Sequence, residues 1–347
     1  MGVAVGVCLS FNNHQSKDGI GAQVVRIIDV YALSRHFNMG FVNSQILQFD
    51  SNPGDNLNTP EEKQNFLSEL VEFLNLESGS CQKLHQTRQV NNSKLFQLPG
   101  ALPTYFILRK LLSHVLNRHE LLIINNPNRL TLRYPNIRSY FTKVPRVSNF
   151  ESNYNNAKSL QDRVCRIHVH IRRGLISKNI LGNRFVPTEW FLSLLLPIQA
   201  TLDELEVNCE FTIHTDVHEG NIQWSSTGVS AESMAYLKEG GNKIDEDLKF
   251  TLAYEDFNVS LRELKFIKIV TELNPLESWK LMQEADILVI GKSSFSFVGA
   301  LLNQSAQVIS PVGFYSGPSD WTYVADSDEL PPSFLKSLQE KYRRPLR

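Results

Sequence analysis

Residues 166–174 read Arg-Ile-His-Val-His-Ile-Arg-Arg-Gly, and this stretch organises the rest of the chain. Apolar and polar residues alternate along it, which predicts a short strand. The strand ends in two arginines and a glycine, so fixed positive charge lies at its carboxyl end. Ligands of open α/β sheets bind at that end, and a planar guanidinium pairs phosphate oxygens two at a time. The stretch therefore predicts a nucleotide-diphosphate site in the second half of the chain.

The chain has 347 residues. This is longer than chains that fold around a single hydrophobic core usually are, so two domains are expected. Its 35 basic and 36 acidic residues nearly cancel, which speaks against a nucleic-acid partner and a broad membrane-surface patch. No apolar run reaches the ~18 residues of a membrane span, and residues 1–10 are typical of a buried strand and not of a signal peptide. We expect a cytoplasmic protein without a transmembrane segment, and peripheral membrane contact stays open.

Strands and helices alternate along both halves of the chain, which predicts an α/β fold with parallel sheets. Thr59-Pro60-Glu61-Glu62 has the pattern of a helix start, with a cap, an early proline and a glutamate three residues on. A helix from about residue 188 should be disturbed at Pro197. Residues 77–94 are expected to form a loop or a short irregular piece, and 143–162 a linker. The predicted units are an N-terminal domain (1–150), a C-terminal domain (160–325) and a helical tail (331–347).

The predicted elements have these approximate limits. Strands are expected at 3–9, 41–42, 121–124, 165–172, 209–215, 266–270, 285–290 and 307–310, and helices at 20–31, 60–74, 103–117, 188 onward, 276–284, 297–302 and 331–347.

The cysteines and histidines give no pattern of a metal site. The four cysteines lie far apart without a Cys-x-x-Cys pair, so buried or free thiols are expected, and two disulfides are the open alternative. His168 and His170 lie two apart on one strand face, but no carboxylate or cysteine joins them in sequence. One of the two is equally well a satisfied core histidine, and His168, deeper in the strand, is the better candidate.

Gly291-Lys292-Ser293 resembles the end of a phosphate loop. Asp286 stands where a Walker loop requires its first glycine, so a Walker ATPase is disfavoured. Ser293 and Ser294 still fall where a strand leads into a helix, and the free backbone N–H groups at such a point make an anion site. The alternative is plain N-capping by serine, and both can hold together.

Two further stretches are open to more than one interpretation. Residues 18–23, Asp-Gly-Ile-Gly-Ala-Gln, precede a helix, and their glycines form either a tight turn or a close backbone approach to a ligand. Asp216 directly follows the strand at 209–215. A carboxylate at this position has two interpretations: it binds a ribose hydroxyl or a base edge, or it caps a turn. The chain lacks the Gly-x-Gly-x-x-Gly pattern of dinucleotide oxidoreductases and the Gly-x-Ser-x-Gly elbow of serine hydrolases.

Three of these stretches occur in the same order in fucosyltransferase-like glycosyltransferases. They are 18–23 with its helix, His-Ile-Arg-Arg-Gly at 170–174, and Ala-Asp-Ile-Leu-Val-Ile-Gly-Lys-Ser-Ser-Phe-Ser at 285–296. The chain resembles the superfamily of α1,2-, α1,6- and protein O-fucosyltransferases, nearest the α1,2 branch. The resemblance implies a GT-B architecture of two facing Rossmann-like domains, with 1–150 on the acceptor side and 160–325 as the nucleotide-sugar-binding domain. It also implies inverting, metal-independent transfer of L-fucose from GDP-fucose to a glycan or glycolipid hydroxyl, without a further cofactor.

The resemblance also implies roles for single residues. Arg172 would contact the β-phosphate and stabilise the departing diphosphate, His170 would lie near the guanine or ribose, and Arg173 would support the loop. Asp18 is the candidate general base. The expected site is therefore Arg172 and Asp18 for catalysis, with His170, Arg173, Asp216, Ser293, Ser294, Gly19, Gly21 and Gln23 for donor binding.

Three positions depart from the pattern of these transferases. Leu175 stands where an acid is usual, Ala22 where asparagine is frequent, and Glu277-Ser278 where a helix often starts with aspartate. Leu175 and Ala22 motivate the alternative hypothesis, a catalytically inactive nucleotide- or glycan-binding protein on the same fold.

Overall fold

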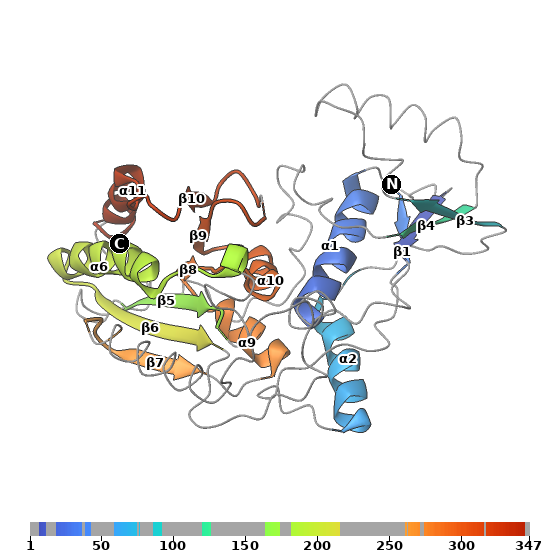
Figure 1. Ribbon diagram of the computed structural model, residues 1–347, viewed down its shortest axis with the longest axis horizontal. Helices are drawn as coiled ribbons and strands as arrows, with labels where there is room; N and C mark the ends of the chain where they lie inside the picture. The colour runs from blue at the N-terminus through green and yellow to red at the C-terminus, as the bar shows by residue number, and fades with distance from the viewer. Residues whose placement is uncertain are drawn as a thin grey trace, which may run out of the picture. The chain divides into compact units, whose positions relative to one another are not determined.

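A computed structural model shows the fold of the chain (Figure 1). It divides into two compact units, Met1–Phe49 with Gln64–Val144, and Asp50–Lys63 with Pro145–Arg347. The structure describes residues 7–11, 19–36, 39–42, 59–74, 76, 86–91, 120–125, 164–173, 182–215, 261, 263–270, 274–315 and 317–343.

The first sheet is parallel, with the order β2-β1-β4-β3. Its strands are β1 (Val7–Phe11), β2 (Gly40–Phe41), β3 (Gln86–Asn91) and β4 (Glu120–Asn125). β3 contradicts the loop expected at 77–94. The stretch Gln-Thr-Arg-Gln-Val-Asn shows no apolar alternation, so no local pattern indicates that it pairs with β4 as the last strand in the sheet order.

Two helices accompany this first part of the chain. α1 (Ile20–His36) is buried on nearly all sides: of its described side chains only Arg35 is exposed, with Ala22 and Arg26 half-buried, so the helix is enclosed beyond the apolar face that its spacing predicts. α2 (Pro60–Leu74) begins at the predicted cap: the Glu62 N–H donates to Thr59 Oγ1 (3.1 Å) and the Thr59 N–H donates to Glu62 Oε2 (2.7 Å). This reciprocal pair is a capping box, which satisfies N–H groups that the helix itself leaves free. The predicted helix at 103–117 lies outside the described residues.

The second sheet has six parallel strands in the order β10-β9-β8-β5-β6-β7 (Figure 1). The chain runs from β5 through β6 to β7 on one side, and then continues from β8 to β10 on the other side of β5. The switch in direction therefore lies between β5 and β8. Its strands are β5 (Val164–Ile171), β6 (Asn208–Thr215), β7 (Ile267–Val270), β8 (Ile287–Val289), β9 (Gln307–Pro311) and β10 (Thr322–Val324).

The helices of this unit pack in pairs against the sheet (Figure 1). They are α6 (Thr188–Glu204), which contacts α11 (Pro332–Tyr342), and α9 (Pro275–Met282), which contacts α10 (Ser294–Leu302), with a short 3-10 turn, η4, at Gly182–Arg184. β5 is buried on both faces from Ile167 onward, as expected of a central parallel strand. The α/β class with parallel sheets is confirmed.

Pro197 does not end α6, contrary to the expected disturbance at this position. The helix runs through it to Glu204. The carbonyl that loses its partner belongs to Ser193, which is exposed, so water can replace the missing hydrogen bond. The apolar face around the proline stays in the core, since Leu194 and Ile198 are fully buried.

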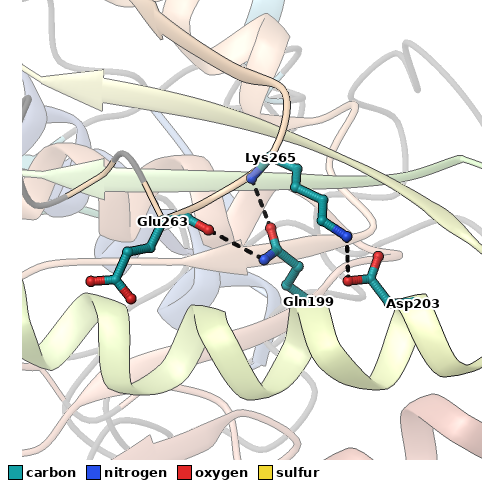
Figure 2. A network of polar contacts seen from close by, with 4 residues as sticks. All are labelled: Gln199, Asp203, Glu263 and Lys265. Atoms are coloured by element: carbon teal, nitrogen blue, oxygen red, sulfur yellow. Dashed lines mark hydrogen bonds and ion pairs between the residues drawn. The ribbon is translucent and has the colours of Figure 1, made fainter.

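The segment before β7 is held to α6 by a short polar network (Figure 2). The side-chain amide of Gln199 accepts from the Lys265 N–H (2.8 Å) and donates to the Glu263 carbonyl (3.4 Å). Lys265 Nζ also lies 2.7 Å from Asp203 Oδ2 in an exposed ion pair. The paired amide bonds fix the path of the backbone next to Phe266, which has a left-handed φ of 50°.

The cysteines differ from the expectation at one position. Cys165 and Cys209 are buried free thiols, whereas Cys8 is disulfide-bonded. Disulfides persist mainly in oxidising compartments, so this bond points away from the predicted cytoplasmic location. Among the described residues, no helix is both long and apolar enough to cross a bilayer.

Candidate functional site

The carboxyl ends of β5 and β8 meet at the switch point of the second sheet. In an open parallel sheet this is where a crevice forms and where ligands bind. The two chain segments approach each other closely here, because a Cβ on Gly291 would lie only 3.1 Å from the His170 carbonyl oxygen and 3.8 Å from the Arg172 nitrogen. Gly291 thus brings the backbone after β8 against the end of β5.

α10 begins immediately after this glycine, with Ser293 as its N-cap. Ser293 is extended, its N–H donates to the Gly291 carbonyl (2.8 Å), and its Oγ accepts from the Phe295 N–H (3.3 Å). The capping interpretation is thereby confirmed. Ser294 opens the helix half-buried, with Oγ 3.0 Å from the Tyr315 hydroxyl. The first turn of a helix carries partial positive charge on its free N–H groups, so this end attracts anions.

The two arginines after β5 differ in their surroundings. Arg173 is buried and donates to the Val186 carbonyl (2.9 Å), the Arg172 carbonyl (3.0 Å) and Thr188 Oγ1 (2.6 Å). Its guanidinium also lies 4.8 Å from the centre of the Phe185 ring. These contacts tie the end of β5 to the start of α6, which is a loop-supporting arrangement. Arg172 is half-buried at the same sheet edge.

His170 is the last histidine of β5 and is buried, with 5% of its surface exposed. Burial, followed by the charge of Arg172, lowers the pKa of His170 to about 3. Its ring lies 5.5 Å from that of Phe295, which in turn stacks on Trp279 at 5.1 Å. No described residue makes a hydrogen bond to its Nδ1. At neutral pH His170 is therefore an uncharged group that can give or take a hydrogen bond but adds no charge.

His168 forms a buried pair with His214 of the neighbouring strand. His168 Nδ1 lies 3.0 Å from His214 Nε2, so the interpretation of His168 as a satisfied core histidine is confirmed. Burial is the main cause that lowers the pKa of both residues, to about 3 for His214. The pair is thus neutral and holds β5 to β6.

Lys292 is a charged residue of this region that the expected site did not include. Its side chain is 10% exposed and its Nζ lies 2.9 Å from Asp326 Oδ2, just beyond β10. The neighbouring Ala325 carbonyl accepts from the indole of Trp190 at 3.0 Å, which anchors this loop to α6. The sequence offered a signal in Gly291-Lys292-Ser293, but the missing first glycine of the Walker pattern removed the reason to assign the lysine a role.

The remaining expected residues lie elsewhere. Gly19, Gly21 and Gln23 belong to the N-terminal unit; Gly19 is exposed, Gly21 is buried in α1, and Gln23 is fully buried there. The backbone N–H groups of Ala22 and Gln23 donate to the Gly19 carbonyl at 3.0 and 3.3 Å, so the glycine forms the first turn of α1.

Two expected site residues, Asp18 and Asp216, fall outside the described residues, as does Leu175. The structure thus brings His170, Arg172 and Arg173 together with Ser293 and Ser294. Within the described part of the chain, no group of three or more His, Cys, Asp or Glu side chains is arranged to hold a metal ion.

No family model matches the chain, and no curated protein matches it. Among solved structures, POFUT1 in complex with GDP is similar over 92% of this chain and 99% of its own, with 12% identity and a TM-score of 0.41. The E. coli heptosyltransferase WaaC with ADP is similar over 97% and 99%, with 8% identity and a TM-score of 0.34. The Methanocaldococcus jannaschii UDP-GlcNAc 2-epimerase is similar over 98% and 69%, with 11% identity and a TM-score of 0.30. These TM-scores lie below 0.5, which is too low to assign a family or an activity.

Proposed function

We propose that the chain is an inverting glycosyltransferase that uses a nucleotide-activated sugar, with GDP-fucose as the donor. The observation that carries the proposal is that β5 and β8 are adjacent at the switch point of the sheet, so that Arg172, just after β5, and the start of α10, just after β8, lie at the same sheet edge. A diphosphate needs charge and hydrogen-bond donors at one place, and these two features supply both. The sequence resemblance to the α1,2 branch of the fucosyltransferases supports the choice of donor.

Each group at this edge has a role in the proposed reaction. Breaking the sugar–phosphate bond develops negative charge on the diphosphate, and a preorganised donor at that charge is worth roughly 3 kcal/mol of barrier. Arg172 supplies the charge, Ser293 and Ser294 supply donors at the helix end, and Arg173 keeps the loop in place through its three hydrogen bonds. His170, neutral at physiological pH, would contact the base or ribose by a hydrogen bond.

The N-terminal unit would complete a GT-B enzyme in this proposal. Gly19, Gly21 and Gln23 at the start of α1 would contribute to donor binding, and Asp18 would take the proton from the attacking hydroxyl of a glycan or glycolipid. Asp216, directly after β6, would hold a ribose hydroxyl of the donor. The proposed reaction is metal-independent, and an enzyme of this kind needs arginine and helix N-termini to neutralise the diphosphate, as Arg172 and the start of α10 would do.

Incubation with GDP-fucose and a panel of acceptors, followed by measurement of released GDP, tests the proposal. Arg172→Ala should abolish release, and Arg166→Ala at the opposite end of the same strand is the matched control that should keep it. Near-normal turnover by Arg172→Ala would contradict the assignment. Binding of GDP-fucose without release across the whole panel would favour the inactive binding protein instead.

A thermal-shift series with GDP, UDP, ADP and CMP tests the choice of nucleotide. A ligand that binds only the folded state raises stability in proportion to ln(1 + [L]/Kd). GDP should give the largest shift at equal concentration. A shift with UDP and none with GDP would overturn the proposed donor while leaving a sugar-nucleotide site in place.

A further inference from the structure

The loop after β9 returns to the start of α10. Tyr315 lies four residues beyond the end of β9, and its phenol oxygen is 3.0 Å from Ser294 Oγ. Ser294 is the first residue of α10. The backbone N–H groups of a first helical turn have no carbonyl of a preceding turn to which they could donate. A tyrosine hydroxyl therefore joins a serine hydroxyl at the positive end of this helix, beside the end of β5.

The Tyr315 ring is held in place by aromatic neighbours. It packs on Phe297 with 4.6 Å between ring centres and meets Phe314 edge-on at 4.4 Å. Phe297 is itself buried and contacts the buried Trp321 at 5.4 Å. Because the ring is fixed by packing, its hydroxyl is positioned before any ligand arrives, and little side-chain freedom is lost on binding.

Two glycines shape the loop that carries Tyr315. Gly313 has a φ of +92°, a left-handed conformation that other residues rarely adopt. A Cβ on Gly317 would lie 2.6 Å from the Trp321 ring, so only glycine fits there. Gly317 therefore lets the backbone after Tyr315 lie close to Trp321, which itself packs on Phe297 of α10.

We propose that Tyr315 is a positioning residue of the diphosphate site, which donates its hydroxyl hydrogen to Ser294 Oγ and so directs the Ser294 hydrogen to a phosphate oxygen. The inference rests on the proposed function. Either oxygen of the pair can donate, but a phosphate oxygen is only an acceptor and selects the arrangement in which Ser294 faces it. Consecutive hydrogen bonds polarise one another, so the relay makes Ser294 a stronger donor.

The test is a double-mutant cycle on GDP affinity, measured by calorimetry on the full chain. Tyr315→Phe keeps the packed ring and removes only the hydroxyl. It should weaken GDP binding about 3- to 10-fold, the scale of one hydrogen bond within a charged site. In a Ser294→Ala background the same change should alter the affinity less than about 1.5-fold, because the partner that Tyr315 orients is gone.

Tyr323→Phe, in β10 beyond this loop, is the matched control. The Tyr323 hydroxyl donates to the Pro318 carbonyl at 3.2 Å. Its removal should change thermal stability without changing GDP affinity, which separates loop packing from the relay.

Three outcomes contradict the inference in different ways. Wild-type affinity in Tyr315→Phe, together with weakened binding in Arg172→Ala, overturns the role of Tyr315 alone. An equal loss with and without Ser294 shows that Tyr315 does not act through the serine. Absence of GDP binding by the wild type overturns both this inference and the proposed function.

Discussion

Acidification should destabilise the C-terminal unit because its central strands bury neutral histidines. His170 and His214 have pKa values of about 3 in the folded chain, and the pKa of His168 is also lowered. In the unfolded chain each has a pKa near 6.5. The unfolded state therefore binds protons first, so stability is complete above that pH and is lost as the pH falls from about 6.5 toward 3.

The magnitude follows from this difference in pKa. At pH 5, about 1.5 units below the unfolded pKa, each histidine that stays neutral in the folded state costs about 2 kcal/mol relative to pH 7.5. His170 and His214 together should therefore remove about 4 kcal/mol, a large share of a typical stability of about 5–15 kcal/mol. Asp286 acts in the opposite direction, because burial raises the pKa of its carboxyl and favours the folded state at low pH.

The assay is urea unfolding followed by tryptophan fluorescence at pH 7.5, 6 and 5. His214→Gln removes one titrating group, so its stability should fall about 2 kcal/mol less than that of the wild type between pH 7.5 and 5. Comparing the two chains cancels the contribution of Asp286. An identical pH dependence in wild type and variant would refute the reasoning, as would a stability that rises on acidification.

Three further predictions concern packing, a buried amide and the cysteines. Gly317→Ala should destabilise by about 1–3 kcal/mol in urea unfolding, because its Cβ would lie 2.6 Å from the rigid Trp321 ring; wild-type stability would contradict this. Asn303→Ala should cost about 3 kcal/mol, because the buried amide donates to the Met282 and Ala285 carbonyls (2.9 and 3.1 Å) and accepts from the Ala306 N–H (2.8 Å); a loss below about 1 kcal/mol would sink it. The unfolded, unreduced chain should show two maleimide-reactive thiols, Cys165 and Cys209, and four after reduction; four before reduction would exclude the disulfide at Cys8.

Buried elements were predictable because their buried positions are occupied by apolar residues, which form runs or regular patterns in the sequence. β5, β8 and β9 are apolar runs of a parallel sheet covered on both faces, and the Thr59 cap of α2 is a local pattern. β3 was missed because a polar edge strand has no apolar period, and β10 because three residues are too few to show one. Strand order, and with it the switch between β5 and β8, depends on contacts that no local pattern records.

The candidate site was predictable where its residues belong to a local sequence pattern. The end of a strand indicated Arg172 and Arg173, and a strand-to-helix turn indicated Ser293 and Ser294. The hydrogen bonds of Arg173 to Val186 and Thr188 depend on how the next loop folds back. Tyr315 lies 21 residues from Ser294 along the chain, so its place beside the helix end could only come from the fold. The disulfide of Cys8 is likewise a tertiary pairing, which spacing alone does not reveal.

The most direct test of the diphosphate site is a calorimetric titration of GDP into wild type, Arg172→Ala and Arg166→Ala. Loss of a charge-assisted guanidinium–phosphate pair should weaken GDP binding by Arg172→Ala about 10- to 100-fold, while Arg166→Ala binds as the wild type does. Equal affinity for GDP in Arg172→Ala and wild type would contradict the site at the β5–β8 switch point.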